Sequence, residues 1–432
     1  MTSNGNSALP DPQRWPDVAA VPRAPLRAAA AARLVRRVAE RVPIHVVSDG
    51  DALGPPGAPE LRLRRPDAFY HRLGARGLIG FGEGYQARDW DTDDLAGLLT
   101  AVAAALRDDR LGALRHLRRF RHLPVTRALF RSRLPRAEEN TVDGARRNIQ
   151  HHYDLSNEMF ALFLDESMTY SSALFPDGRS GGVAVAPAPG DLAVAQRNKI
   201  DRLLDRAGVG PGSRVLEIGT GWGELAIRAA RRGATVHTVT ISVEQRDLAL
   251  RRVAEAGVAD RVTIELRDYR LIEPTDPDGY DAIVSVEMIE AVGERYWPAY
   301  FATLDRLLAP GGRVGLQAIL VPHERLRAAR RTYTWIQKYI FPGGVILSTE
   351  AIEQLVARHT RLRVRESHAF GTHYAATLRL WRERFTANTA AVEALGFDQT
   401  FRRTWEYYLA SCEAGFAAGH LDVRQFILEP RP

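Results

Sequence analysis

The stretch RVLEIGTGWGELAIRAARRGATVHTVTI, residues 214–241, decides the fold that this sequence predicts. It contains a short apolar strand, a glycine-rich turn, a helix and a second apolar strand, because its hydrophobic period changes from strand to helix and back. Further apolar strands follow at VTIEL, YDAIVSV and GRVGLQAI, and a helix is expected over residues 242–257. Apolar strands that alternate with helices predict an α/β fold with a mostly parallel sheet and right-handed crossovers.

The glycine turn in this stretch indicates a cofactor site. Gly219, Gly221 and Gly223 follow Glu217 with the spacing G-x-G-x-G, and glycines here let the backbone approach a ligand at the N-terminus of the helix. Pyrophosphate-binding turns are spaced G-x-G-x-x-G, so this turn favours a cofactor without a phosphate there, such as S-adenosylmethionine. Asp268, after the third strand, could accept a hydrogen bond from an adenine amino group.

The end of the second strand departs from the common pattern of nucleotide-like sites. Such sites usually have an acid there for the ribose hydroxyls, whereas this strand ends in Thr240 and Ser242. Ser242 and Gln245 also match the S-x-x-Q pattern of a capping box for the next helix. Both interpretations, a cofactor contact and a helix cap, stay open for this pair.

Length and composition are those of a globular protein with two domains. The chain has 432 residues, of which 45% are hydrophobic and 26% charged, and a domain usually takes roughly 100–200 residues. Its single cysteine, Cys412, excludes intrachain disulfides and cysteine-based metal sites, and no metal is expected. The sequence has no apolar run near the roughly 20 residues that span a bilayer and no signal-peptide pattern at its start. A cytoplasmic protein is therefore expected.

We expect the following division of the chain. Residues 1–24 form a flexible proline-rich tail, residues 25–140 a small α+β domain, and residues 141–432 the catalytic domain, which a flexible insertion at 176–190 interrupts.

The small domain has recognisable elements of its own. A helix is expected over residues 26–40, and IHVVSDG and ELRLRRP are expected to be strands that flank a Gly/Pro turn. A short helix, a glycine-rich turn and a longer helix follow, and Asp91 or Thr92 is the expected cap of the longer helix.

Positive charge is concentrated after this helix. The formal net charge is +7, and residues 106–147 contain twelve arginines against five acidic residues. We call residues 106–147 the basic belt. Such a belt favours a polyanion, either nucleic acid or an anionic membrane surface, and the alternative is a solvated helix face.

From residue 148 onward the sequence resembles the cyclopropane-fatty-acid synthase family of S-adenosylmethionine-dependent methyltransferases. The motifs that carry the resemblance are HHYDLSNEMFALFLDESMTYSSALF, VLEIGTGWGELA, TISVEQ, EMIEAVGERYWPAYF, WIQKYIFPGG and HYAATLRLW. The resemblance implies a class I methyltransferase domain, an unsaturated phospholipid acyl chain as substrate and a bound bicarbonate ion as base. It also implies that the N-terminal domain assists lipid engagement and dimerisation, which places the protein on the inner face of the membrane.

The resemblance assigns residues to both parts of the site. Together with the glycine turn, it predicts that the cofactor contacts are Tyr170, Ser171, Glu217, Gly219, Gly221, Gly223, Thr240, Ser242, Gln245, Asp268 and Tyr269. Glu290 and the backbone of Ile319 would hold bicarbonate, and the predicted catalytic set is Ser172, Glu290, Gln317, Ile319, Tyr374 and His152. His152 either belongs to this set or only fixes the start of the next helix. A carboxylate at Glu290, after an apolar strand, is costly unless it is paired, which favours a function for it.

The chemistry that the resemblance implies needs such a site. An isolated double bond is a poor nucleophile, and its attack on a sulfonium methyl leaves a carbocation that must be shielded from water and then deprotonated by a weak base. An apolar tunnel with aromatic faces would shield it. Aromatic residues at helical spacing are more often ordinary core, and the candidates for lining the tunnel are Phe160, Phe163, Tyr170, Trp297, Tyr300, Trp335, Tyr339 and Phe341.

Three departures from the ring-forming members decide which product we expect. Ser172 replaces a cysteine, Ala291 stands in place of a histidine, and Gln317 replaces a histidine near the anion. This variant pattern resembles the actinobacterial branch that makes methyl-branched fatty acids such as tuberculostearic acid. We therefore prefer a 10-methylene product, which a partner reductase would reduce, to a cyclopropane.

Other functions remain as alternatives. A nucleic-acid methyltransferase would use the basic belt, but it would need a base-flipping pocket and typically an N/D-P-P-Y or catalytic cysteine motif, and neither motif is present, so no nucleic-acid partner is expected. An inactive lipid-binding homologue is the third possibility, since a cysteine and a histidine typical of the family are missing.

Overall fold

The computed structural model describes residues 9–107, 140–141, 144, 156–176, 179–180, 183–184, 186–273, 278–329 and 332–432. The chain divides into two compact units. The first contains Met1–Arg133, Arg331–Tyr339 and Thr386–Ala418, and the second contains Leu134–Arg330, Ile340–Phe385 and Gly419–Pro432. The division predicted from the sequence stays a prediction, and it did not anticipate the two later segments that return to the first unit.

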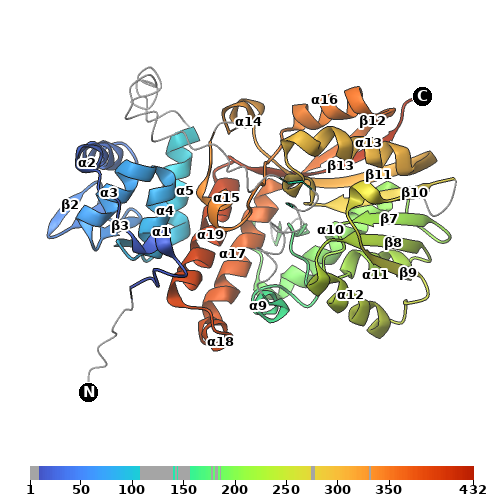
Figure 1. The fold of residues 1–432 in the computed structure, drawn as a ribbon, viewed down its shortest axis with the longest axis horizontal. Helices are drawn as coiled ribbons and strands as arrows, with labels where there is room; N and C mark the ends of the chain where they lie inside the picture. Colours follow the sequence, from blue (N-terminus) through green and yellow to red (C-terminus); the bar gives the residue numbers. More distant parts are fainter. Residues whose placement is uncertain are drawn as a thin grey trace. The chain divides into compact units, whose positions relative to one another are not determined.

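The second unit is built on a seven-stranded sheet in the order β12-β13-β11-β10-β7-β8-β9 (Figure 1). The strands are β7 (Arg214–Ile218), β8 (Thr235–Thr240), β9 (Val262–Leu266), β10 (Tyr280–Val286), β11 (Leu308–Leu320), β12 (Leu362–Ala369) and β13 (Asp422–Pro430). The strands from β7 to β11 pair in parallel, whereas β13 is antiparallel to both of its neighbours. The predicted α/β fold with a mostly parallel sheet is confirmed.

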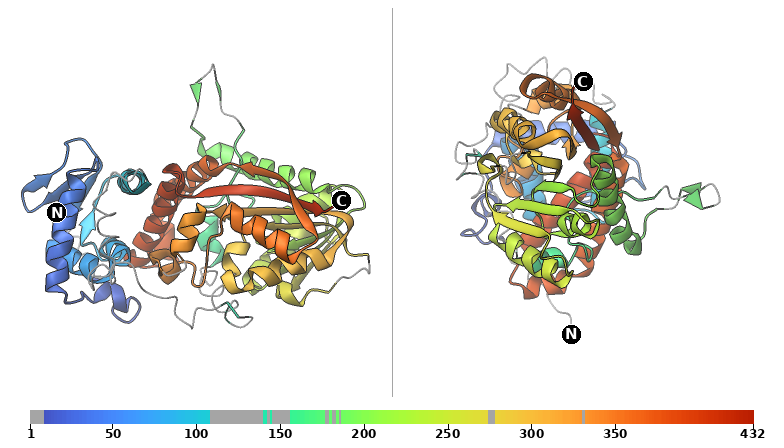
Figure 2. Two further views of the ribbon diagram at one scale, coloured as in Figure 1. Left: turned by 90° about the horizontal axis from the view of Figure 1, so that it is seen from above. Right: turned by 90° about the vertical axis from the view of Figure 1, so that its right-hand side faces the viewer.

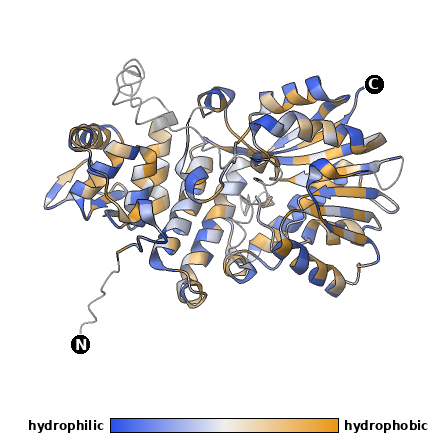
Figure 3. Ribbon diagram, viewed as in Figure 1, coloured by the Kyte–Doolittle hydropathy of each residue, from blue (hydrophilic) through white to orange (hydrophobic). Residues whose placement is uncertain are grey.

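Helices cover both faces of this sheet (Figure 2). One face carries α10 (Leu192–Ala207), α11 (Glu224–Arg231) and α12 (Val243–Glu255), and the other carries α13 (Trp297–Leu307) and α16 (Thr349–His359). Successive strand residues point to opposite faces, so Ile283 of β10 packs in one hydrophobic core while Ala282 and Val284 pack in the other. Burial on both faces explains why the central strand β10 contains the largely apolar run AIVSV, and Figure 3 shows orange segments in the middle of the sheet.

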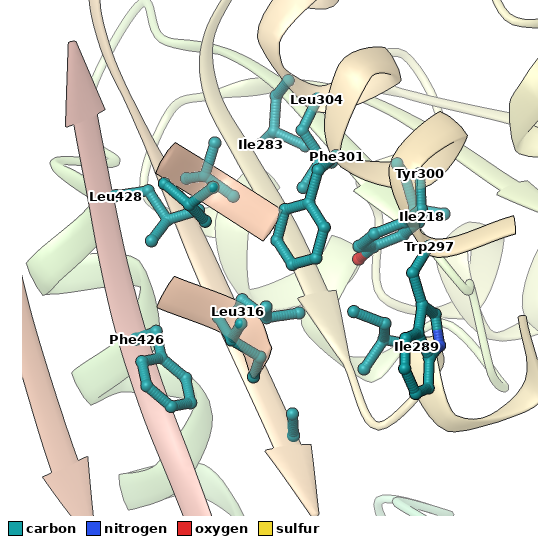
Figure 4. Packing of buried hydrophobic residues seen from close by; sticks show 14 of the residues in the cluster. Ile218, Ile283, Ile289, Trp297, Tyr300, Phe301, Leu304, Leu316, Phe426 and Leu428 are labelled. Carbon is teal, nitrogen blue, oxygen red and sulfur yellow. The ribbon is translucent and has the colours of Figure 1, made fainter. Parts of the chain in front are cut away.

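The core beneath α13 is rich in aromatic side chains. Figure 4 shows Trp297, Tyr300 and Phe301 of α13 packed with Ile283 and Leu316 of the sheet. All five are at most 3% exposed. Trp297 and Tyr300, which were candidates for lining an acyl tunnel, are thus part of this core.

The second unit has further helices and strands. They are α9 (Asn157–Ala161), β5 (Arg179–Ser180), β6 (Val183–Ala184), α14 (His323–Ala329) and α17 (Gly371–Ala387), and the last two residues of α17 belong to the first unit. β5 and β6 form an antiparallel pair within the stretch predicted to be an insertion, and Figure 2 shows this pair projecting from the second unit.

The first unit combines a four-stranded sheet, in the order β2-β1-β3-β4, with helices. Its strands are β1 (His45–Ser48), β2 (Asp51–Leu53), β3 (Glu60–Leu63) and β4 (Trp90–Asp91). Its helices are α1 (Pro16–Ala19), α2 (Pro25–Ala39), α3 (Pro66–Arg76), α4 (Leu78–Gln86), α5 (Leu95–Arg107), α15 (Trp335–Tyr339), α18 (Thr389–Ala394) and α19 (Gln399–Ala417). The two predicted strands are confirmed as β1 and β3, which pair in parallel, and β2 is an additional strand that forms a hairpin with β1.

Two details predicted for this unit are wrong. The expected glycine-rich turn is helix α4, in which glycines permit close packing: a Cβ at Gly80 would lie 2.1 Å from the backbone oxygen of Arg72, and one at Gly82 would lie 2.5 Å from the Trp335 ring. The cap of α5 is Asp94, not Asp91 or Thr92, because its carboxylate accepts from the Gly97 amide at 2.8 Å. Among the described residues, no helix is both long enough and apolar enough to cross a membrane.

Candidate active site

The carboxyl ends of the parallel strands form the candidate site. The strand order reverses between β7 and β10, and in open α/β sheets ligands bind outside the carboxyl ends of the strands at such a point. The glycine turn follows β7 at this place. Gly219 and Gly221 have φ angles of +100° and +52°, a region that only glycine adopts without strain, and a Cβ at Gly221 would have no neighbouring atom within 4 Å. The turn therefore leaves its backbone open to a ligand, and Gly223, also at positive φ, begins α11.

Glu217 lies at the end of β7, directly before the turn. Its carboxylate accepts a hydrogen bond of 2.6 Å from the Thr238 hydroxyl. Burial raises the pKa of this carboxyl to about 8, although the Thr238 hydrogen bond and the charge of Lys199 oppose the shift. Lys199 donates to the Ser171 hydroxyl at 2.6 Å, so it ties the predicted cofactor contact Ser171 to helix α10.

Of the pair Ser242 and Gln245, only Ser242 acts as a helix cap. The Ser242 hydroxyl accepts from the Gln245 amide at 3.2 Å, which makes Ser242 the N-cap of α12. The Gln245 side chain accepts from the Thr240 hydroxyl at 2.8 Å instead of completing a capping box. All three side chains are buried beside the turn, so the cap is established for Ser242, and a role of the three in cofactor binding stays a prediction.

Asp268 begins the short 3-10 helix Tyr269–Leu271. Its carboxylate binds Arg270 through both the amide, at 2.9 Å, and the guanidinium, at 2.6 and 2.8 Å. The guanidinium also stacks 5.1 Å from the centre of the Tyr296 ring. Asp268 is thus held in place, and because a carboxylate has several acceptor positions it can still accept from an adenine. Tyr269 is buried next to it, and burial raises the pKa of its phenol.

An aromatic cluster packs against the glycine turn. Ser156 caps α9 by accepting from the Met159 amide, and α9 brings Phe160 to 5.0 Å from the Trp222 ring within the turn. Phe160 and Phe163 lie 5.2 and 6.1 Å from Tyr170, edge to face. The capped helix and these ring contacts place Tyr170 near the turn.

Other aromatic candidates lie elsewhere. Trp335 and Tyr339 belong to the first unit, where their side chains hydrogen-bond to Gln86 and Glu83. Phe341 lies in the second unit and is partly buried. His152 lies outside the described residues, as does most of the basic belt.

A carboxylate outside the predicted catalytic set lies at the centre of that set. Glu287, one residue beyond β10, accepts three hydrogen bonds: 3.0 Å from the Ser172 amide, 2.8 Å from the Gln317 side chain and 2.7 Å from the Tyr374 hydroxyl. Three of the predicted residues thus converge on one carboxylate, and we call these three donors the cradle. Burial raises the pKa of Glu287, whereas the cradle and the charge of Lys199 oppose this shift.

The sequence contained a signal for Glu287. It lies three residues before Glu290 in SVEMIEAVG, directly after an apolar strand. The cost of burying a carboxylate, which favoured a function for Glu290, applies to Glu287 equally.

A chain of hydrogen bonds fixes the orientation of the Gln317 amide. Gln425 on β13 donates to the Gln317 carbonyl oxygen at 3.1 Å, which leaves the Gln317 amino group to face Glu287. The carbonyl oxygen of Gln425 in turn accepts 2.6 Å from Arg202, and Arg202 pairs with Glu366. Both glutamines are fully buried, so they are held in a single arrangement.

Glu290 is the second carboxylate of the site. One of its oxygens accepts a hydrogen bond from the Ile319 amide, which is the backbone contact predicted for a bound anion. Its other oxygen is buried and has no partner among the described residues. Burial, followed by the charge of Glu287, raises the pKa of Glu290 to about 8. Glu290 is therefore largely protonated at neutral pH.

The resemblance implies two small molecules at this site, and the residues present fit S-adenosylmethionine but not bicarbonate. The open, left-handed glycine turn and the neighbouring Tyr170 and Ser171 suit S-adenosylmethionine. Bicarbonate does not fit, because the cradle donors are bound to Glu287 and the Ile319 amide is bound to Glu290. The charge of the Glu287 carboxylate would also repel a further anion placed beside it.

A seven-stranded sheet in this order, with one antiparallel strand and a glycine turn after its first strand, defines the class I S-adenosylmethionine-dependent methyltransferases. The mycolic acid cyclopropane synthetase family matches residues 141–426 of this sequence, and the chain belongs to that family.

Individual relatives extend this likeness. Tuberculostearic acid methyltransferase UfaA1 of Mycobacterium tuberculosis is 53% identical, over 99% of this chain and 98% of the relative. Cyclopropane-fatty-acyl-phospholipid synthase of Escherichia coli is 33% identical, over 88% of this chain and 90% of the relative. The crystal structure of mycolic acid cyclopropane synthase CmaA1 complexed with SAH and CTAB has a TM-score of 0.58 and 29% identity, and it covers 66% of this chain and 98% of its own.

Proposed function

We propose that this protein transfers a methyl group from S-adenosylmethionine to the double bond of an unsaturated phospholipid acyl chain. The observation that carries the proposal is the 53% identity, along almost the whole chain, to a tuberculostearic acid methyltransferase. The glycine turn at the switch point of the sheet and the carboxylates beside it supply the two parts that the reaction needs, a cofactor site and a base.

When bound, S-adenosylmethionine supplies an electrophilic methyl group on a sulfonium. The glycine turn and the segment from Tyr170 to Ser172 would hold this group toward the end of β10, where the carboxylates lie. The rings of Phe160, Phe163 and Tyr170 form an apolar wall beside the turn, which would keep water from the carbocation on the acyl chain. Aromatic faces also attract a cation.

We propose a 10-methylene chain as the product. The π electrons of the double bond would form the new C–CH3 bond while the bond from the methyl group to sulfur breaks and its electrons stay on sulfur, and the positive charge remains on the other alkene carbon. A 1,2-hydride shift moves the charge to the methylated carbon, and loss of a methyl proton then leaves an exocyclic double bond. A separate reductase would convert this product to the 10-methyl chain.

A cyclopropane is the second candidate product, and the 33% identity to an Escherichia coli cyclopropane synthase favours it. It would arise if the methyl proton were lost before the hydride shift, with closure of the ring. The position of the base relative to the cation decides between the two outcomes.

We also propose that the protein works as a peripheral protein at the inner surface of the membrane and that it forms a homodimer. Its substrate is a membrane lipid, and the basic belt would be attracted to anionic headgroups. Reversing the charge of several belt arginines should weaken binding to anionic vesicles, most strongly at low salt. Unchanged binding would indicate that the belt is a solvated face.

Transfer of a labelled methyl group tests the proposed function. Purified protein is incubated with methyl-13C S-adenosylmethionine and vesicles of oleoyl phosphatidylglycerol, and the lipid is analysed by NMR and mass spectrometry. We expect the label in an exocyclic methylene carbon. Label in a cyclopropane carbon would favour the second candidate, and label in added RNA but not in lipid would contradict the proposal.

A further inference from the structure

The contacts of Glu287 place a carboxylate where the family resemblance calls for a separate anion. The cradle consists of one backbone amide, one side-chain amide and one phenol, from three distant segments of the chain. Hydrogen bonds of this kind to a charged acceptor are stronger than those between neutral groups. The cradle is thus an oxyanion site that the chain itself fills.

We propose that the Glu287 carboxylate is the built-in base of this protein and takes the place of an external bicarbonate. This inference rests on the proposed methyl transfer to an acyl chain, and it names the group that receives the proton. In this step a C–H bond of the transferred methyl breaks, its electrons form the new C=C bond, and the proton moves to an oxygen of Glu287. The proton then leaves to solvent, so the enzyme returns to its starting state without a co-reactant.

The backbone at Glu287 supports a role for this side chain beyond packing. Its φ angle is +49°, a left-handed conformation that a residue with a Cβ adopts at a cost, and residues held in such conformations cluster at functional sites. Glycine would adopt the same conformation without strain. The chain nevertheless has a glutamate here, and that glutamate fills the cradle.

The surroundings of Glu287 suit a weak base. The cradle holds the carboxylate in one orientation, and the Gln425 contact fixes the amide of Gln317. Burial raises the pKa of Glu287, which brings a carboxylate closer to the range in which a general base works near neutral pH. Glu290, largely protonated beside it, adds no second negative charge at that pH.

Two substitutions of Glu287 distinguish its role as the proton acceptor from its role in filling the cradle. Glu287→Gly removes the carboxylate, relaxes the backbone and leaves the cradle free to bind a small anion. Glu287→Gln keeps the shape and fills the cradle, but it cannot accept the proton. We expect both to reduce turnover by roughly 100-fold or more, the usual lower range for loss of a general base. Bicarbonate or formate should restore turnover only to Glu287→Gly.

A matched control tests for effects of the backbone alone. Asp49 is an exposed acidic residue of the first unit with a φ angle of +44°. Asp49→Gly therefore replaces an acid at positive φ with glycine away from the site. We expect it to retain the turnover of the wild type.

Direct binding of 13C-labelled bicarbonate, followed by NMR, gives a readout that does not depend on turnover. The expected result is binding to Glu287→Gly, with no binding to the wild type or to Glu287→Gln. Saturable binding to the wild type, or full turnover of Glu287→Gln, would overturn the inference. Absence of methyl transfer to lipid by the wild type would instead refute the proposed function, so the two failures are distinguishable.

Discussion

The glycine turn and the carboxylate cradle lie at the same edge of one sheet, yet they are built in different ways. The turn is one continuous stretch after β7, and its proposed function depends on backbone conformation at glycines. The cradle joins Ser172, Gln317 and Tyr374, which are up to about 200 residues apart, around a single side chain. A local backbone device is visible in a sequence, whereas a site assembled from distant side chains becomes visible only in the fold.

If the turn acts through its backbone, a side chain at Gly221 should damage cofactor binding more than folding. Gly221→Val introduces a branched residue at a φ of +52°, into space where no other atom lies within 4 Å. We expect the affinity for S-adenosylmethionine, measured by calorimetry, to fall by about 100-fold, which corresponds to about 2.7 kcal/mol.

Gly257 provides the control for this substitution. It also has a positive φ, +68°, with open space around it, but it lies at the end of the helix that follows β8. Gly257→Val should lose stability through strain while keeping its cofactor affinity. Equal loss of affinity in both variants would mean that strain, not ligand contact, explains the effect at Gly221.

If the cradle acts through Glu287, loss of one donor should change the pH dependence of turnover. The Tyr374 hydroxyl lowers the pKa of Glu287, against the upward effect of burial. Tyr374→Phe should therefore raise that pKa further and move the acid limb of the turnover profile to higher pH, with a loss of about tenfold near neutral pH. A tenfold loss with an unchanged profile would show that Tyr374 serves packing alone.

The raised pKa of Glu290 predicts how stability depends on pH. Its pKa is about 8 in the folded protein, against 4.5 ordinarily, so the folded state binds the proton more tightly. Its contribution to stability is complete below pH 4.5 and is lost as the pH rises through 8. Glu290→Gln should remove this loss.

Thermal unfolding of Glu290→Gln and of the wild type at pH 6 and pH 9 measures this effect. We compare the free energy of unfolding of the variant minus that of the wild type at the two pH values. This difference should be larger at pH 9 than at pH 6 by about 1 kcal/mol or more, or roughly 2–4 °C in Tm. A difference in Tm that stays constant between the two pH values would contradict a raised pKa at Glu290.

The smallest effect is expected at Ser242, where the structure supports a cap. Ser242→Ala should cost about 1 kcal/mol of unfolding free energy, the usual value for loss of an N-cap, with unchanged affinity for S-adenosylmethionine. Loss of affinity without loss of stability would instead assign Ser242 to the cofactor site.

Features that depend on local sequence could be predicted, whereas features that depend on distant contacts could not. The parallel sheet and the glycine turn follow from periodicity and local composition, and both are present. The glycine-rich helix α4 was mistaken for a turn because its glycines serve close packing against Arg72 and Trp335, and those contacts are not visible in the local sequence. Glu287 was overlooked because its importance depends on three partners from distant segments, together with a positive φ angle that sequence does not display.

The most direct test of the account is turnover by the wild type in the absence of bicarbonate. Transfer of the methyl group to unsaturated phospholipid is measured in buffer freed of carbon dioxide and again after addition of bicarbonate. If Glu287 is the base, the two rates should agree within about twofold. A loss of tenfold or more in the freed buffer, restored by bicarbonate, would contradict the account.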